Sequence, residues 1–244
     1  ALPSAQTLGV IEMAEIPPVE VYRTHMVEFK LRLIHCEQVA SATKSTTGLA
    51  ALDSEFCFLQ IRRLVELVAF SSALRDEERY KTLRQVQRQS NPKDHGDHTR
   101  DWEAPEILRR MVQISPYCLP IPLKRETKQV GATIQFDTKN ISVTHGRLIE
   151  IYQICGGFLH AKNPFSQDYR SQVHKERKKY EGAKKEILKC LAFFRKLMWY
   201  HAAVSLSWTV GDDPMTAADP KAAWVVDFGS DKDQLINIVV AEAQ

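Results

Sequence analysis

One apolar segment limits most strongly what this chain can fold into. Residues 52–70, LDSEFCFLQIRRLVELVAF, have helical spacing, and their apolar positions leave no wide polar face. A helix that is apolar nearly all round needs neighbours on several sides. The sequence therefore predicts a helical bundle in which residues 50–75 form the most buried helix. Asp53 or Ser54 is the expected N-cap, and the pattern continues to Gln87 as one helix.

Further amphipathic patterns supply the neighbours of this helix. Apolar residues recur every three or four positions between charged ones, which predicts helices over 19–42, 102–114, 147–160 and 169–201. Thr144 is the expected cap of the helix that ends at His160. These helices are enough to cover a central helix in a bundle.

The other segments read as arm, loop or strand. Pro17 and Pro18 end an N-terminal arm, 1–18, and the polar segment 88–102 predicts a loop. Three prolines between 116 and 122 exclude a helix and a central strand, whereas 130–143 favours strand or irregular structure. Three short runs near the C-terminus, VSLSWTV, AAWVVDF and LINIVVA, are separated by turn residues and predict an antiparallel meander.

The predicted fold class is α+β, mainly a helical bundle followed by a small C-terminal antiparallel β-meander. We expect a helical domain over 19–201, with a proline-rich insertion near 115–145, and a β tail over 202–244 that packs on the bundle. The sequence shows no internal repeats.

Cysteine use and hydropathy predict a cytoplasmic protein. Five cysteines stand singly among apolar neighbours, and an odd number cannot all pair within one chain. Reduced thiols in a reducing compartment are the simpler interpretation, so Cys155 is expected to be a buried free thiol. No apolar run reaches the roughly 20 residues of a membrane helix, and the first residues lack the pattern of a signal peptide.

Charged residues inside the central helix form the first candidate site. Arg62 and Arg63 lie four and three residues before Glu66, so both reach its carboxylate on a helix. A charge in a core has to be paired, and the pairing is expected whether the group braces the bundle or serves chemistry.

The segment YQICGGFLHAKNPF, 152–165, is the second candidate. Two adjacent glycines inside a helix, Gly156 and Gly157, favour the close approach of a neighbouring helix. His160 falls at the C-terminal end of this helix, where the helix dipole favours a protonated imidazole. It is either a capping residue or a general acid or base.

Two charged segments complete the candidates. In KDHGDHTRD the acidic and histidine residues match no established metal spacing, so a solvated loop is expected, with no metal and no cofactor. Residues 170–189 hold eight Lys or Arg and three Glu, a net charge of +5 against +3 for the whole chain. This basic half of a helix predicts contact with a protein or nucleic-acid partner. The candidate binding residues are Arg170, Lys175, Arg177, Lys178, Lys179, Lys184 and Lys185.

Common catalytic motifs are missing from the sequence. It has no Walker A loop, no G-x-G-x-x-G after a strand, no G-x-S-x-G and no H-E-x-x-H. Nucleotide hydrolysis, hydride transfer and the common hydrolase mechanisms therefore have no support.

The stretches LQIRRLVELVAF and YQICGGFLHAKNP resemble uncharacterised bacterial proteins that have a helical body and a small β-rich tail. The chain also resembles the HEPN superfamily, helical proteins of bacterial toxin and defence systems, some of which cut RNA with an R-x4-6-H motif. Arg147 lies too far before His160 for that motif, and the literal match from Arg88 to His95 falls in the expected loop. A HEPN-like site would take Arg63 from another helix.

Two functional hypotheses follow. The preferred one is a cytoplasmic interaction or accessory protein, associated through the resemblance with bacterial defence or mobile elements, whose basic helix or β tail contacts a partner. The alternative is a metal-independent ribonuclease in which His160 is acid or base, Arg63 stabilises phosphate charge and Glu66 orients Arg63. Whether His160 and Arg63 share an open pocket separates the two, and the sequence leaves the oligomeric state open.

Overall fold

The computed structural model describes residues 17–91, 93–115, 117–124, 141–159, 165, 169–207, 209, 211–216 and 220–242. The helices are α1 (Pro18–Ser41), α2 (Ala50–Arg75), α3 (Glu77–Ser90), α4 (Ala104–Ile114), α5 (Ile141–Leu159) and α6 (Tyr169–Met198), with a short 3-10 helix, η1 (His98–Arg100). The strands are β1 (Ile121–Pro122), β2 (Tyr200–Leu206), β3 (Pro220–Asp227) and β4 (Asn237–Glu242).

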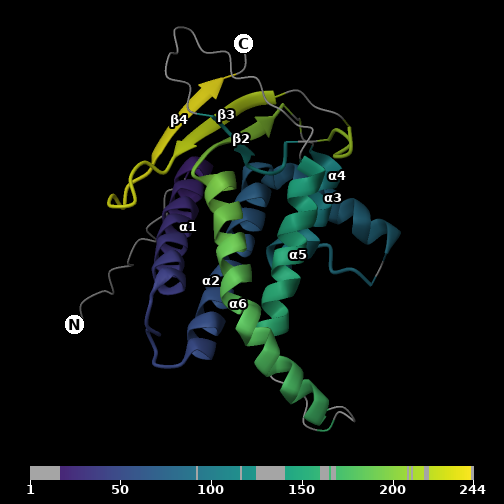
Figure 1. The fold of residues 1–244 in the computed structure, drawn as a ribbon. Helices are drawn as coiled ribbons and strands as arrows, with labels where there is room; N and C mark the ends of the chain where they lie inside the picture. Colours follow the sequence, from purple (N-terminus) through teal and green to yellow (C-terminus); the bar gives the residue numbers. More distant parts are fainter. Residues whose placement is uncertain are drawn as a thin grey trace, which may run out of the picture.

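The predicted α+β class is confirmed. Helices α1, α2, α5 and α6 run alongside one another, and the sheet lies across one end of them (Figure 1). The sheet has the order β1-β2-β3-β4 with antiparallel neighbours, so β2 to β4 form the expected meander. Pro122 is in the short edge strand β1, the position in a sheet that tolerates proline.

Helix α2 occupies the centre of the bundle, as its sequence predicts. It packs against α1, α4, α5 and α6, and it buries Cys57, Phe58, Ile61, Leu64, Val65 and Val68, among others. Phe58 stacks on Phe158 of α5 with ring centroids 3.8 Å apart. Phe58 directly precedes the stretch LQIRRLVELVAF and Phe158 lies in YQICGGFLHAKNP, so α2 and α5 pack together where these two motifs lie.

The expected N-cap of this central helix is wrong. The helix begins at Ala50, and the carboxylate of Asp53 accepts hydrogen bonds from the backbone N–H groups of Thr46 and Thr47, at 2.9 and 3.0 Å. Asp53 therefore holds residues 42–49, the α1–α2 link, in place. The hydroxyl of Ser54 donates back to the carbonyl of Ala50.

The single long helix expected up to Gln87 is divided at Asp76 into α2 and α3. At the division the buried guanidinium of Arg75 lies 3.3 Å from the Asp76 carboxylate, and it donates to the carbonyls of Tyr117 and Cys118. These partners come from a distant segment, so the helical period of the sequence carries no sign of the break.

Two other boundaries differ from those expected. Residues 141–143 belong to α5 rather than to a strand, since β propensity depends on context and does not by itself fix a strand. Residues 130–140 lie outside the described residues. Thr144 consequently lies within α5. Helix α6 ends at Met198, so His201 lies in β2 and not in the helix. Between α6 and β2, the carbonyl of Trp199 accepts a hydrogen bond from the N–H of Phe228.

Helices and strands share one apolar core. Ala203, Val226, Phe228 and Ile236 belong to the same buried cluster as the helical residues. All five cysteines are free and buried, which confirms the expectation for Cys155. The division into a helical domain, 19–201, and a β tail, 202–244, stays a prediction. Among the described residues, no helix combines the length and the hydropathy needed to cross a membrane.

Candidate functional site

The first candidate site lies where α2 faces α5. Glu66 contacts both arginines of its own helix, with Arg62 Nε at 3.3 Å and an Arg63 terminal nitrogen at 2.7 Å. The predicted pairing is therefore confirmed. Arg62 also donates to the Tyr152 hydroxyl at 2.5 Å, and its guanidinium lies 4.3 Å from the centre of the Tyr152 ring. Tyr152 is the first residue of the second motif, so side chains of both motifs meet here.

Burial separates the roles of the two arginines. The Glu66 side chain is 12% exposed and that of Arg62 is 23% exposed, whereas that of Arg63 is 57% exposed. Burial raises the pKa of Tyr152, and the nearby Arg62 opposes this. Arg62 thus joins the two helices, and Arg63 is the cation that a phosphate group from solvent can reach.

The other members of this candidate site are only partly placed. His160 lies outside the described residues, so its distance from Arg63 stays a prediction. Gly156 is half-buried and Gly157 is exposed, while Cys155 is fully buried on the packed face of α5. The close approach of a helix at these glycines stays a prediction.

The second candidate site is the basic half of α6. Figure 1 shows that this half extends past the ends of α1, α2 and α5. Arg170, Lys175, Arg177, Lys178 and Lys179 lie on its described backbone, while their side chains lie outside the description. Lys184 and Lys185 are exposed, and Lys184 donates to the carbonyl of Ala42 at 3.3 Å.

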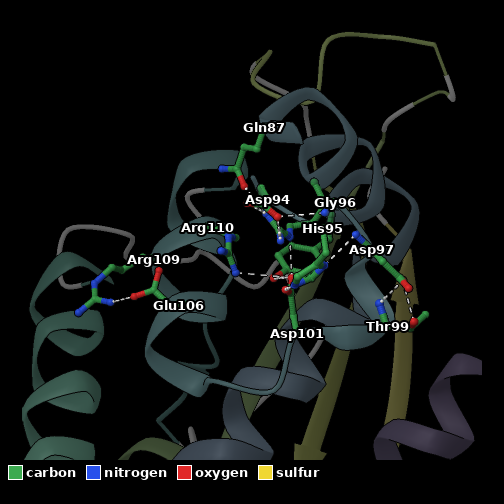
Figure 2. Close-up of polar contacts among 12 residues, drawn as sticks. Gln87, Asp94, His95, Gly96, Asp97, Thr99, Asp101, Glu106, Arg109 and Arg110 are labelled. Carbon is green, nitrogen blue, oxygen red and sulfur yellow. Dashed lines mark hydrogen bonds and ion pairs between the residues drawn. The ribbon is translucent and has the colours of Figure 1, made fainter. Parts of the chain in front are cut away.

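A charge cluster that the sequence did not reveal holds the loop between α3 and α4 (Figure 2). The Arg84 side chain, 1% exposed, contacts Asp94 at 2.6 and 2.8 Å. Its Nε lies 2.7 Å from Asp101, whose carboxylate also accepts a hydrogen bond from the Tyr80 hydroxyl at 2.7 Å. Arg110 approaches Asp101 from α4 at 3.5 Å. Two guanidinium groups thus balance two carboxylates.

The charged groups of this cluster are paired with one another, and their pKa values shift accordingly. Arg84 holds the pKa of Asp94 well below its usual range, and Asp94 in turn raises the pKa of Arg84. Burial, and then Asp101, raise the pKa of Tyr80. The segment is a loop of exposed and half-buried residues, as expected, but its Asp94 and Asp101 carboxylates are tied to Arg84. No helical spacing links Arg84 with Asp94, ten residues later, so pattern analysis had no signal for the pair.

His95 in the same loop has both ring nitrogens engaged. Its Nδ1 accepts a hydrogen bond from the Asp97 N–H at 3.0 Å, which places the proton on Nε2, 3.5 Å from Asp101. It is thus not poised as a general base. Gly96 beside it has φ +68°, and a Cβ there would lie 2.5 Å from Arg88 Cδ, so the turn requires glycine. The described residues contain no group of three or more side chains placed to hold a metal ion.

Comparisons with models of protein families, with curated proteins and with solved structures find no match to this chain.

Proposed function

We propose that the protein is a cytoplasmic accessory protein that binds the phosphate backbone of a nucleic acid through the basic half of α6. The observation that supports the proposal most is the position of the charge excess. Residues 170–189 carry a net charge of +5, so the rest of the chain sums to −2, and the helix that bears them extends beyond the bundle. A row of cations on a protruding helix suits contacts with successive phosphates.

Residues next to α6 also support binding to a negatively charged partner. Exposed Lys184 lies beside the α1–α2 link, where Lys44 is also exposed. Both lysines border the same cavity, which Asp53 also lines, so the link adds one cation beside α6. An acidic protein surface is the competing partner, and the experiment below separates the two.

A salt titration tests the proposal. In Lys178→Gln/Lys179→Gln/Lys185→Gln, three cations on α6 are neutralised, and in the control Lys93→Gln/Lys221→Gln/Lys232→Gln, three exposed lysines elsewhere are changed. Fluorescence anisotropy with single-stranded RNA and duplex DNA gives the affinity at each salt concentration. We expect the slope of log affinity against log salt to fall by about 2 to 3 in the first variant, because each neutralised phosphate contact contributes about 0.7 to 0.9. The control should keep the slope.

The outcomes are distinct. A wild-type protein that binds neither nucleic acid at low salt would contradict the proposal, as would equal losses in the two variants. Binding to polyglutamate in place of nucleic acid, lost only in the α6 variant, would identify an acidic protein as the partner class.

The ribonuclease alternative is favoured by one observation: the largely exposed guanidinium of Arg63 is oriented by Glu66. In that alternative His160 supplies the proton transfer. Arg63→Ala and His160→Ala should each reduce RNA cleavage by about 10²-fold or more with unchanged α6-dependent binding. Cleavage that persists in both variants, or that is absent from the wild type, removes the alternative.

A further inference from the structure

Two buried thiols face each other across the contact between α1 and α2. The Cys36 thiol donates to the carbonyl of Cys57 at 3.7 Å, and the Cys57 thiol donates to the carbonyl of Cys36 at 3.8 Å. The arrangement is reciprocal, so each side chain points at the backbone of the other residue. Both residues are at most 1% exposed, and both are free thiols.

The two thiols differ electrostatically. The neighbouring Cys57 is the largest cause of a raised pKa at Cys36, and the contact with Cys36 is the largest cause of a lowered pKa at Cys57. The thiolate is the reactive form of cysteine. Cys57 also lines the cavity described next, and Cys36 does not, so Cys57 is the thiol that an entering oxidant meets first and Cys36 is its partner.

A cavity gives a small molecule a route to this pair. A space of about 220 Å³ lies between the α1–α2 link and α6, and Cys57 is part of its lining. Exposed residues of the link, Thr43, Lys44 and Ser45, border the same cavity, so it reaches the surface. Lys184 from α6 and Asp53 from α2 line it as well. Such a cavity is large enough for hydrogen peroxide.

We infer that Cys36 and Cys57 form a redox site in which peroxide entering this cavity converts the dithiol into a disulfide between α1 and α2. The Cys57 sulfur attacks one peroxide oxygen, the O–O bond breaks, and the first water leaves after proton transfer, giving a sulfenic acid. The Cys36 sulfur then attacks the Cys57 sulfur and displaces the second water. Two thiols lose two protons and two electrons, and one peroxide becomes two waters. An external thiol reverses the reaction by exchange.

The other three cysteines have neither a lowered pKa nor a place in the lining of the cavity. Burial raises the pKa of Cys118 to about 12 and that of Cys190 to about 11, and it also raises the pKa of Cys155. None of the three lines the cavity. The inference therefore predicts oxidation at one pair of the five cysteines.

Thiol mapping on the folded chain tests the inference. The protein is treated with hydrogen peroxide under native conditions, quenched, denatured, alkylated and digested, and the peptides are identified by mass. We expect the Cys36–Cys57 disulfide as the principal product, a loss of two alkylatable thiols per chain, and full recovery after dithiothreitol. Oxidation that joins other cysteines or links two chains, or five thiols that stay intact, would overturn the inference.

Single substitutions sharpen the result. Cys57→Ala and Cys36→Ala should each abolish the intramolecular disulfide, whereas Cys118→Ala, which removes a buried thiol outside the cavity, should leave it in full yield. Trapping with dimedone should label Cys57 in the Cys36→Ala protein. A label on Cys36 in the Cys57→Ala protein at the same rate would contradict the assigned order. Should a variant fail to fold, peptide mapping of the wild type decides alone.

Discussion

A single histidine illustrates how burial fixes a protonation state. His201 is fully buried, and its Nδ1 donates to the Met198 carbonyl at 2.7 Å. Because a carbonyl only accepts, the proton is on Nδ1, and Nε2 accepts a hydrogen bond from the Tyr22 hydroxyl at 2.9 Å. Burial lowers the pKa of His201 to about 4. The imidazole is therefore neutral in the folded protein at physiological pH.

This histidine should make stability depend on pH. The unfolded chain binds a proton at an ordinary histidine pKa of about 6.5, whereas the folded protein resists protonation until about pH 4, so stability is complete above about pH 6.5 and falls below it. We expect the free energy of unfolding to fall by about 3 kcal/mol between these two pH values through this residue. Urea unfolding at several pH values measures it. The variant His201→Gln should lose about 3 kcal/mol less over the same range, and identical pH profiles would contradict the assignment.

At the scale of elements, a buried ion cluster sets how α3, α4 and the loop between them fit together. Arg84 comes from α3, Asp94 and Asp101 from the loop and Arg110 from α4, so each segment holds the next in place. The exposed pair Arg109–Glu106 on α4 lies in the same region and provides a comparison (Figure 2). Removing one partner of a buried pair leaves an uncompensated charge, which is far more costly than losing an exposed pair.

We therefore expect Arg84→Met to lower the free energy of unfolding by about 3 to 5 kcal/mol, because Asp101 stays buried with less compensation. Arg109→Met should change it by less than about 1 kcal/mol. Chemical denaturation measures both variants, and proteolysis within residues 93–103 should increase only in the first. Equal stabilities of the two variants would show that the cluster contributes no more than a surface pair.

At the scale of the molecule, the sheet completes the core of the bundle. Tyr22 of α1 packs edge-on against Trp224 of β3, with ring centroids 5.2 Å apart. The buried ammonium of Lys30 donates to the carbonyls of Phe228 and Leu235, at 2.5 and 3.1 Å. Apolar and polar contacts thus join the C-terminal segment to α1, which lies at the other end of the chain.

We expect helices and sheet to unfold in one transition, because neither part buries its apolar face without the other. Far-UV circular dichroism follows the helices. In a Trp102→Phe/Trp208→Phe protein, fluorescence follows Trp199 and Trp224 at the boundary between helices and sheet. The two urea curves should coincide. A sheet signal lost at lower urea than the helical signal would instead support separate domains over 19–201 and 202–244.

The sequence by itself determined those features that depend on near neighbours. The period of apolar residues predicted the central position of α2, and three- and four-residue spacing predicted that Glu66 pairs with Arg62 and Arg63. Alternation and turn residues predicted the meander of β2, β3 and β4. Helical and strand periods depend on residues close together in the chain, so they can be recognised from the sequence alone.

Only the tertiary structure decided the features that join distant segments. Beside the division at Asp76, Arg75 bonds to the carbonyls of Tyr117 and Cys118, and the Arg84 cluster depends on where the loop returns to α3. The contact of Arg62 with Tyr152, ninety residues later, and the facing thiols of Cys36 and Cys57 likewise arise from helix packing. These contacts follow no period in the sequence, because which residue meets a buried charge or thiol depends on how the whole chain folds.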